Sequence, residues 1–462
     1  MPVLRYGIEF PDRIKQREGR LFVKEVAMIR EPVVAGKFYP ESPDELRAMI
    51  ASFVDSEAEK ENVLGLIMPH AGYIYSGAVA GAAISRVKFK PTFIIIGPNH
   101  TGRGSPLSIM SEGKWKTPLG EVGIDSILAR KLLSLSRYLQ EDDVAHEYEH
   151  SIEVQLPFLQ YFQPDIKIVP IVVAYGEIEI CQELGQNIAR ALRELNQEAV
   201  ILASSDMSHY EPQKATLKKD HKAIEAILEM NPELLVQRVE EDNITMCGFA
   251  PAAIMLTAAR EMGGGQAKLV KYQTSGEVSG DFDAVVGYAG IIVKKLSPIV
   301  KLAKDALEAY IKEGQIWQEK ELTPEMKEKA GVFVCIKKEG ELRGCIGTFE
   351  PTQDNVADEI IANAISTATR DPRFERVQRD ELADLDYTVD VLTHPEPVES
   401  PGKLDPKKYG VIVQCGYRRG LLLPDLEGVD TVDYQIDICR QKGGIGPDEP
   451  VQLYRFEVKR YK

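Results

Sequence analysis

The sequence has no apolar run approaching the ~18 residues that a membrane-spanning helix needs, so we expect no membrane association. Its first residues carry scattered charges and no apolar core, which is not the pattern of a secretory signal. Positive charge is also in deficit, with 56 Lys and Arg residues against 71 Asp and Glu residues and a net charge of −15. Bulk nucleic-acid binding needs a basic surface. We therefore expect a cytoplasmic protein that binds neither membranes nor nucleic acids.

Cysteine is sparse as well. The chain has six cysteines, widely spaced and without a CxxC pair: Cys181, Cys247, Cys335, Cys345, Cys415 and Cys439. In a chain of 462 residues this pattern predicts reduced thiols and not a disulfide framework.

Histidine is both rare and unevenly distributed. Six of the seven histidines precede residue 222, namely His70, His100, His146, His150, His209 and His221, and only His394 follows. The chain is also longer than one ordinary hydrophobic core. We predict an N-terminal extension over 1–27, a first domain over 28–295 and a second domain of different chemistry over 297–462.

The first domain has the pattern of an α/β protein. Near-continuous Val, Ile and Leu occur at 63–68, 92–97, 167–175 and 199–204, with helical patterns such as 177–195 between them. Continuous apolar strands are typical of sheets that are covered on both faces. We predict a parallel or mixed sheet with flanking helices. Beyond residue 297 a helix, a hairpin over 331–349, a second helix over 354–370 and further strands predict a smaller α+β domain.

Polar residues follow three of the predicted strands directly. His70, His100 and the pair Asp206 and His209 each lie just beyond an apolar run. Open α/β sheets bind ligands outside the carboxyl ends of their strands. A single histidine in a turn is most commonly a hydrogen-bonded loop residue, but several at one sheet edge favour a common site.

Two further segments could add metal ligands. His146 and His150 are four residues apart, and we expect them on one face of a helix start. Cys247 stands just before an apolar helix and by itself would be a small buried hydrophobe. Imidazole and thiolate are the usual ligands of zinc, copper and iron. His221 falls in a helical pattern and is expected on a solvated face.

The second domain contains the stretch LRGCIG at 342–347, with Cys345 between Gly344 and Gly347. Glycines let a ligand approach the thiol closely, although a buried cysteine in a tight strand is the simpler interpretation. A nucleophilic cysteine needs a base nearby, and the sequence does not place His394 there. The stretch RDPRF at 370–374 is predicted to be a turn with a paired arginine.

Six motifs over 28–295 together resemble the Memo (mediator of cell motility) family: EPVVAGKFYP, MPHAGYIYSG, GPNHTG, HEYEHSIEVQLPFL, SSDMSHY and MCGFAP. That family is similar in fold to the extradiol ring-cleaving dioxygenases, which hold a non-haem iron with two histidines and a carboxylate. The resemblance implies that His70, His100 and Cys247 are metal ligands. Two imidazoles and a thiolate suit iron, and alternatively copper or zinc.

The same resemblance places His209, Asp206 and His150 in the pocket beside the metal. It implies a catalytic role for them, with His209 as the acid–base group and Asp206 orienting it. A dioxygenase-like oxidoreductase is the activity that such a site suggests.

The stretches LRGCIG, RDPRF, RGLLLP and ICRQKGGI resemble the AMMECR family over 297–462. This resemblance implies a fold more than an activity. Memo-like and AMMECR-like domains accompany a radical SAM protein in a three-part prokaryotic set. The chain lacks the CxxxCxxC motif of radical SAM enzymes, so the resemblance implies a separate radical SAM partner.

Three functions remain open at this point. The first is a metal-dependent oxidoreductase working beside the radical SAM partner. The second is a non-catalytic adaptor that binds a metal, a small molecule or a peptide in the same cleft. The third is a thiol-dependent factor that acts through Cys345.

Overall fold

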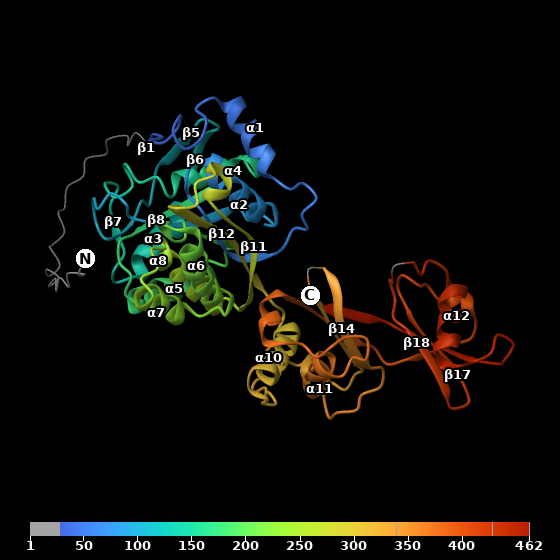
Figure 1. The fold of residues 1–462 in the computed structure, drawn as a ribbon. Coiled ribbons are helices and arrows are strands. Elements are labelled where there is room, and N and C mark those ends of the chain that lie inside the picture. Colours follow the sequence, from blue (N-terminus) through green and yellow to red (C-terminus); the bar gives the residue numbers. More distant parts are fainter. Residues whose placement is uncertain (1–27, 339, 427, 462) are drawn as a thin grey trace.

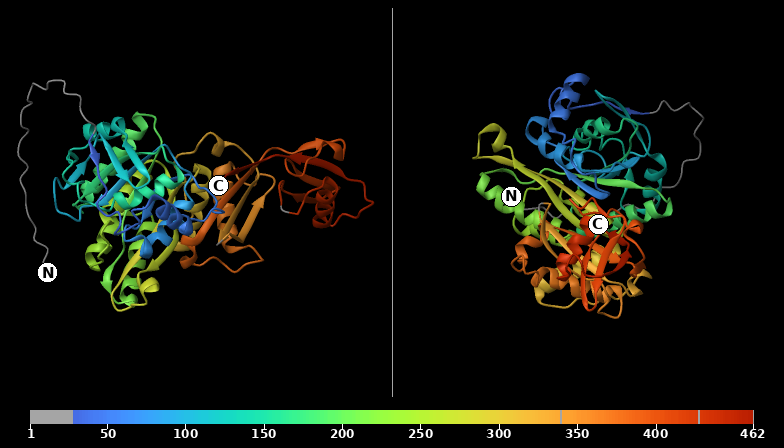
Figure 2. Two further views of the ribbon diagram at one scale, coloured as in Figure 1. Left: turned by 90° about the horizontal axis from the view of Figure 1, so that it is seen from above. Right: turned by 90° about the vertical axis from the view of Figure 1, so that its right-hand side faces the viewer.

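The computed structural model describes residues 28–461 apart from residues 339 and 427. The predicted extension over 1–27 lies outside the described residues. Figure 1 shows a large α/β unit in blue to yellow, followed by smaller units in orange and red, and Figure 2 shows the same arrangement from two further sides. The division into a large α/β part and a smaller α+β part confirms the predicted fold class.

The large unit is built on a mixed sheet. Its strands are β1 (Ile29–Arg30), β2 (Val63–Met68), β3 (Thr92–Pro98), β4 (Leu107–Ile109), β5 (Lys114–Thr117), β6 (Gly120–Ile124), β7 (Gln140–Glu141), β8 (Lys167–Val173), β9 (Ala199–Ser204), β10 (His209–Glu211), β11 (Gly264–Thr274) and β12 (Val285–Lys295). The main strand order is β1-β5-β6-β8-β3-β9-β2-β12-β10, with β11 against β12 and β4 against β7 and β8.

The centre of this sheet is parallel. Strands β8, β3, β9 and β2 run side by side in the same direction, and β12 is antiparallel to β2. Every residue of β2, β3 and β9 is buried, as expected for strands that are covered on both faces. The four apolar runs identified in the sequence are therefore the core of the sheet.

Helices cover both faces of the sheet. They are α1 (Pro43–Phe53), α2 (Tyr73–Ser85), α3 (Ser126–Leu135), the 3-10 turn η1 (Glu153–Gln155), α4 (Leu156–Phe162), α5 (Ile178–Glu194), α6 (Gln213–Leu228), α7 (Pro232–Glu241), α8 (Phe249–Glu261) and α9 (Gly276–Ser279). Helices α3, α5 and α8 pack together on one face, and α1, α2 and α4 pack together on the other. Helix α8 lies directly on β2, β3 and β9 and is apolar nearly all round, which is typical of a helix enclosed by its neighbours.

The smaller part contains two antiparallel sheets. Its elements are α10 (Pro298–Glu313), η2 (Glu325–Lys327), β13 (Val332–Lys338), β14 (Glu341–Thr348), α11 (Val356–Thr369), η3 (Arg379–Asp384), β15 (Leu385–Leu392), β16 (Glu396–Val398), η4 (Pro401–Lys403), β17 (Gly410–Cys415), β18 (Arg418–Leu422), α12 (Val432–Gly443), β19 (Gln452–Phe456) and β20 (Val458–Tyr461). The sheet orders are β14-β13-β15-β20 and β16-β19-β17-β18. Helices α10 and α11 pack on the first sheet and α12 on the second.

The predicted hairpin is present, and it corrects the prediction of reduced thiols. Strands β13 and β14 pair antiparallel, and Cys335 lies directly opposite Cys345. The structure joins the two as a disulfide. Spacing along the chain gave no sign of this bond because strand register, not a short motif, brings the two sulfurs together. The other four cysteines are free.

The large and small parts meet at β11, β12 and the start of β15. Gln266 donates a hydrogen bond of 2.7 Å to the backbone oxygen of Leu385. Asp386 pairs with Lys268 at 2.7 Å and with Lys294 at 3.2 Å, and Lys294 also pairs with Glu61 at 2.6 Å. These ion pairs fix the position of β15 against the long strands of the large sheet.

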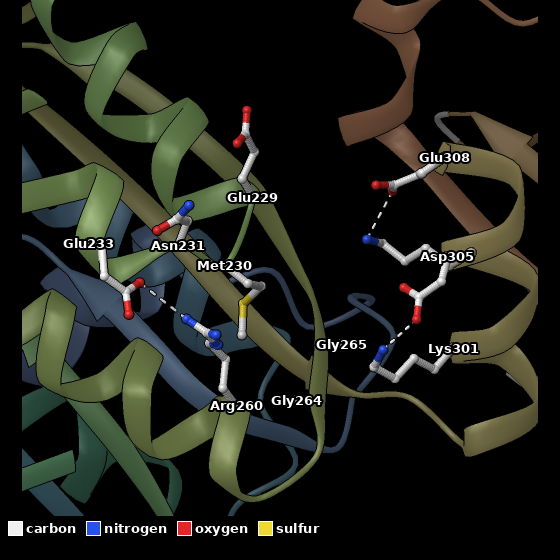
Figure 3. A pocket seen from close by; sticks show the side chains of 11 residues that line it. Glu229, Met230, Asn231, Glu233, Arg260, Gly264, Gly265, Lys301, Asp305 and Glu308 are labelled. Atoms are coloured by element: carbon white, nitrogen blue, oxygen red, sulfur yellow. Dashed lines mark hydrogen bonds and ion pairs between the residues drawn. The ribbon is translucent and has the colours of Figure 1, made fainter. Parts of the chain in front are cut away.

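A crevice of about 660 Å³ separates α10 from the helices of the large unit. Figure 3 shows ion pairs between charged side chains within each wall. Glu233 pairs with Arg260 on one side, and Lys301 pairs with Asp305 on the other. No helix within residues 28–461, as far as they are described, is long and apolar enough to span a membrane.

Candidate metal centre

The site forms where neighbouring parallel strands end. Strands β3, β9 and β2 are adjacent in the sheet and end at Pro98, Ser204 and Met68. Each strand is followed, two residues after its end, by a predicted site residue: His100 after β3, Asp206 after β9 and His70 after β2. The predicted convergence at one sheet edge is therefore present.

Three imidazoles meet at this edge. His70, His100 and His150 each offer a ring nitrogen, and these nitrogens lie within 4.8 Å of one another. The ring centroids of His100 and His150 are 4.7 Å apart, and that of His70 lies 5.1 Å from His100 and 5.5 Å from His150. Neutral imidazole is the commonest metal ligand of proteins, so the three rings form a candidate metal centre.

Cys247 joins the cluster from a different direction. Its Sγ lies 3.4 Å from Nε2 of His70. Bonds of ~2.3 Å to sulfur and ~2.0–2.1 Å to nitrogen at a tetrahedral ion separate these two atoms by roughly 3.6 Å. Cys247 is thus placed to bind the same ion as His70. The three ligand atoms that all lie within 4.8 Å of one another are, however, the ring nitrogens of His70, His100 and His150. The group of three ring nitrogens thus includes His150, which the sequence analysis placed in the pocket beside the metal, together with the predicted ligands His70 and His100.

Two glycines permit this close approach. A Cβ atom at Gly248 would lie 2.4 Å from the backbone oxygen of Ser204, and one at Gly97 would lie 2.3 Å from Oγ of Ser151. Gly248 brings the segment with Cys247 against the end of β9, and Gly97 brings the end of β3 against the segment that follows His150. Any larger residue at either position would push the site apart.

Hydrogen bonds fix the orientation of the rings. Nδ1 of His70 lies 2.9 Å from Oγ of Ser204, and Nδ1 of His100 lies 2.9 Å from Oε1 of Glu149. With Nδ1 engaged, Nε2 of each ring stays available as a ligand. Metal-binding histidines almost always have such a partner, and a carboxylate in this role also makes the imidazole more basic.

Glu149 is the buried centre of this arrangement. Its side chain is fully buried and accepts hydrogen bonds from the backbone N–H of His100 at 2.6 Å and of Ser151 at 2.8 Å, in addition to the ring of His100. Nδ1 of His150 lies 3.4 Å away. Burial opposes ionisation, but the hydrogen bond from His100 and the other donors outweigh it and lower the pKa of Glu149 to about 2.

The protonation of the rings follows from their surroundings. Burial lowers the pKa of His70 well below its usual value, and the neighbouring imidazoles lower it further. Burial likewise lowers the pKa of His150. The pKa of His100 is raised, because its bond to Glu149 outweighs the effect of burial. Two of the three rings are therefore neutral near pH 7, the form that binds metals.

Asp206 and His209 lie in the pocket, but not as the sequence analysis paired them. Asp206 accepts a 2.8 Å hydrogen bond from the backbone N–H of His70. Nδ1 of His209 lies 2.9 Å from the backbone oxygen of Thr245, so Thr245, and not Asp206, orients the His209 ring. Burial raises the pKa of Asp206 to about 6, although the N–H of His70 opposes this shift.

His146 does not share a face with His150. The segment 143–148 forms turns and bends, and the helical structure begins only at Glu153. The ring of His146 is buried edge-on against Trp115, with the centroids 6.0 Å apart. Spacing of four residues therefore misled the sequence analysis. His221, in contrast, lies on the exposed face of α6 as predicted.

The sequence analysis missed Glu149, Ser204 and Thr245. Glu149 stands next to His150 in the chain, and an acidic residue adjoining a candidate ligand was a signal that could have identified it. Ser204 and Thr245 act through a hydroxyl and a backbone carbonyl, and neither leaves a mark in the sequence.

A cavity of about 560 Å³ opens beside the three rings. Its lining includes His209, Asp206 and aromatic side chains, with Phe38, Tyr75 and Tyr288 among them. Tyr210 also lines it and is 78% exposed, with a left-handed backbone φ of 56°. A non-glycine residue in this region carries a cost of order 1 kcal/mol, which indicates that the surrounding structure holds Tyr210 in place.

Two segments of the chain match the models of known families. Residues 30–292 match the family model described as Memo-like protein, and residues 300–461 match the model described as AMMECR1. A MEMO1 family protein of Methanococcoides burtonii is 48% identical over 268 residues, covering 58% of this chain and all of that protein. A MEMO1 family protein of Aquifex aeolicus is 42% identical over 266 residues, covering 57% of this chain and 98% of that one.

Two solved structures were also found. An uncharacterized protein from Pyrococcus horikoshii is 34% identical with a TM-score of 0.33 and covers 35% of this chain and 88% of its own. An uncharacterized protein from Escherichia coli K12 is 15% identical with a TM-score of 0.37 and covers 50% of this chain and all of its own. By its family matches, the chain belongs to the Memo family and has an AMMECR1 domain on the C-terminal side of its Memo domain.

Proposed function

We propose that the Memo domain is a metal-dependent oxidoreductase whose single transition-metal ion is bound by His70, His100 and His150. The observation that carries this proposal is the shared position of their ring nitrogens, all within 4.8 Å. Cys247, in contact with His70, is the additional donor. Iron is the metal that the family resemblance favours, and the same imidazole and thiolate donors suit copper or zinc.

The donor set fits a transition metal and not a hard cation. Nitrogen and sulfur ligands favour iron, copper or zinc, whereas Mg²⁺ and Ca²⁺ prefer oxygen. The three imidazoles and the thiolate of Cys247 would occupy four positions, and an iron ion with six positions would keep two open for a small molecule. A redox-active ion bound there would supply electron transfer to a small molecule in the adjoining cavity of about 560 Å³.

The residues around the cavity would handle protons. His209 is fixed by Thr245 through Nδ1, so its Nε2 is free to accept or donate a proton. Asp206 has a pKa raised to about 6 by burial, and a carboxyl group with such a value exchanges protons near neutral pH. Phe38 and Tyr75 supply apolar walls that exclude water from the bound molecule.

Oxygen consumption by anaerobically prepared, iron-loaded protein tests this activity. A panel of small aromatic diols should support oxygen uptake in the wild type. His209→Ala should retain the metal and lose most of the turnover, because the ligands are unchanged. Uptake that is equal in the wild type and in metal-free protein would contradict the proposal.

The alternative is a non-catalytic adaptor, and one observation favours it. Tyr210 is highly exposed at the cavity mouth and is held in a left-handed conformation, which suits stacking against an extended ligand. Binding of peptides without oxygen uptake, reduced by Tyr210→Ala, would select this function.

The remaining expectations from the resemblance belong to the same proposal. We place the domain boundary near residue 296, the protein in the cytoplasm and a radical SAM protein beside it as a separate chain. Co-purification of a radical SAM protein with the tagged full chain, from cells of the source organism, tests the last of these.

A further inference from the structure

The Cys335–Cys345 pair lies outside the metal centre, on the first sheet of the AMMECR1 domain. The two residues are cross-strand neighbours on β13 and β14, with Cα atoms 4.1 Å apart. Antiparallel residues at this short spacing form a pair without mutual backbone hydrogen bonds, and their side chains stand closest together. The register of the hairpin alone therefore brings the sulfurs together.

The backbone of Cys345 is held from its other side. Strand β14 lies at the edge of its sheet, so the N–H and C=O of Cys345 pair with no further strand in the part of the chain that the structure describes. Instead, the N–H donates a 2.9 Å hydrogen bond to Asp371, and Arg373 donates a 3.2 Å hydrogen bond to the carbonyl oxygen. Arg373 pairs with Asp371 at 2.7 Å. This is the paired arginine that the RDPRF stretch predicts. Together, Asp371 and Arg373 make the two backbone hydrogen bonds to Cys345 that a neighbouring strand would otherwise make.

These contacts mean that the disulfide is not needed to hold the hairpin. Breaking the bond leaves Cys345 fixed by Asp371 and Arg373, and leaves Cys335 paired to β15 opposite Thr388. The domain also has its own apolar core beneath the sheet, formed by α10, α11 and the inward side chains of β13 and β15. Small domains that rely on disulfides lack such a core.

Both cysteines are also accessible. Cys335 and Cys345 are half-buried on the outer face of the sheet, where β13 alternates between buried Val334 and Ile336 and the more open Phe333 and Cys335. Cys181 and Cys439, by comparison, are fully buried. A thiol reagent in solution can reach the pair without unfolding the domain.

We propose that Cys335 and Cys345 form a thiol–disulfide exchange site that takes dithiols as its substrates. One thiolate of the dithiol attacks one sulfur of the pair, forms a mixed disulfide and releases the other cysteine as a thiolate, which takes up a proton. The second thiol of the dithiol then displaces the remaining cysteine and gives up its proton. The dithiol loses two electrons and two protons to become a disulfide, and the protein pair gains them as two thiols.

Alkylation of the folded full-length chain tests this inference. Oxidised protein is incubated with dithiothreitol, with glutathione, or with thioredoxin and its reductase, and then treated with iodoacetamide and analysed by peptide mass. We expect two additional alkylated residues, Cys335 and Cys345, while Cys181 and Cys439 stay unlabelled. The rates of reduction by glutathione and by thioredoxin compare a small monothiol with a protein dithiol. The proposal expects thioredoxin to reduce the pair faster.

The variants Cys335→Ser and Cys345→Ser each remove the bond and should each leave one additional thiol labelled without any reductant. Circular dichroism should show that reduction leaves the fold intact. The inference is overturned if the native bond resists every reductant until the protein unfolds, since the pair would then be a fixed crosslink. It is equally overturned if both thiols of reduced protein stay unjoined in excess oxidised glutathione, which is a stronger oxidant than oxidised dithiothreitol.

Discussion

Replacing Glu149 by Gln should weaken metal binding with little change in shape. The two oxygens of Glu149 accept three N–H groups, from the backbone and ring of His100 and from the backbone of Ser151. An amide of the same shape has only one acceptor oxygen, so its NH₂ group must face at least one of these donors. Leaving one buried donor without a partner costs about 1–3 kcal/mol.

The effect on the metal has a separate cause. Loss of the carboxylate behind a ligating histidine typically reduces metal affinity by about 10–100-fold, which corresponds to roughly 1.4–2.7 kcal/mol. Titration calorimetry with Zn²⁺ and Co²⁺ measures the affinity, and thermal unfolding of metal-free protein measures the stability. Both should fall in Glu149→Gln.

Two control variants separate these effects. Glu153 is also fully buried, but it pairs with Arg30, accepts hydrogen bonds from Val33, Val34 and Tyr39, and has no hydrogen bond to the three rings among the described residues. Glu153→Gln should lose stability and keep its metal affinity, and the exposed Glu147→Gln should change neither. Unchanged metal affinity in Glu149→Gln, with the expected loss of stability, would refute the orienting role of Glu149.

Three further results are expected. Cys247→Ser should keep one metal per chain, but its metal affinity should be lower and its metal preference should shift away from soft metals. In Co²⁺-loaded protein it should remove any thiolate-to-cobalt charge-transfer absorption. The dependence of that affinity on pH should also weaken, because burial raises the pKa of the Cys247 thiol and ligation must release its proton. Tyr210→Ala should leave the metal affinity unchanged and raise KM for any substrate. Burial lowers the pKa of His146 to about 3. Below about pH 6.5 the unfolded chain therefore binds a proton that the folded chain does not bind, and the free energy of unfolding falls as the pH drops towards 3. In urea unfolding, His146→Gln should remove about 2 kcal/mol of the stability loss between pH 6.5 and 4.5.

The central sheet was predictable because its strands are buried on both faces. Continuous Val, Ile and Leu runs at β2, β3 and β9 need no partner information to be recognised. The placement of His70 and His100 followed from the same runs, since residues beyond parallel strand ends must meet at one edge. The α+β character of the second domain followed from the hairpin over 331–349.

What the sequence did not reveal depends on contacts between distant segments. The spacing of four residues suggested that His146 and His150 share a helical face. In the structure His146 packs against Trp115, whereas His150 lines the cavity. The choice of Thr245 over Asp206 as the partner of His209 is made by the approach of the segment before α8. Cys335 looked like any strand residue until the register of β13 and β14 placed it opposite Cys345.

Metal analysis of ligand variants tests the central claim most directly. Protein purified without oxygen and loaded with Fe²⁺ should carry one equivalent of metal in the wild type. His70→Ala, His100→Ala and His150→Ala should each lose most of it while keeping the wild-type circular dichroism spectrum, because each side chain comes from a segment beyond the sheet core. His221→Ala, on the exposed face of α6, should retain a full equivalent. Retention of one equivalent by all three ligand variants would contradict the assignment of the metal centre to these imidazoles.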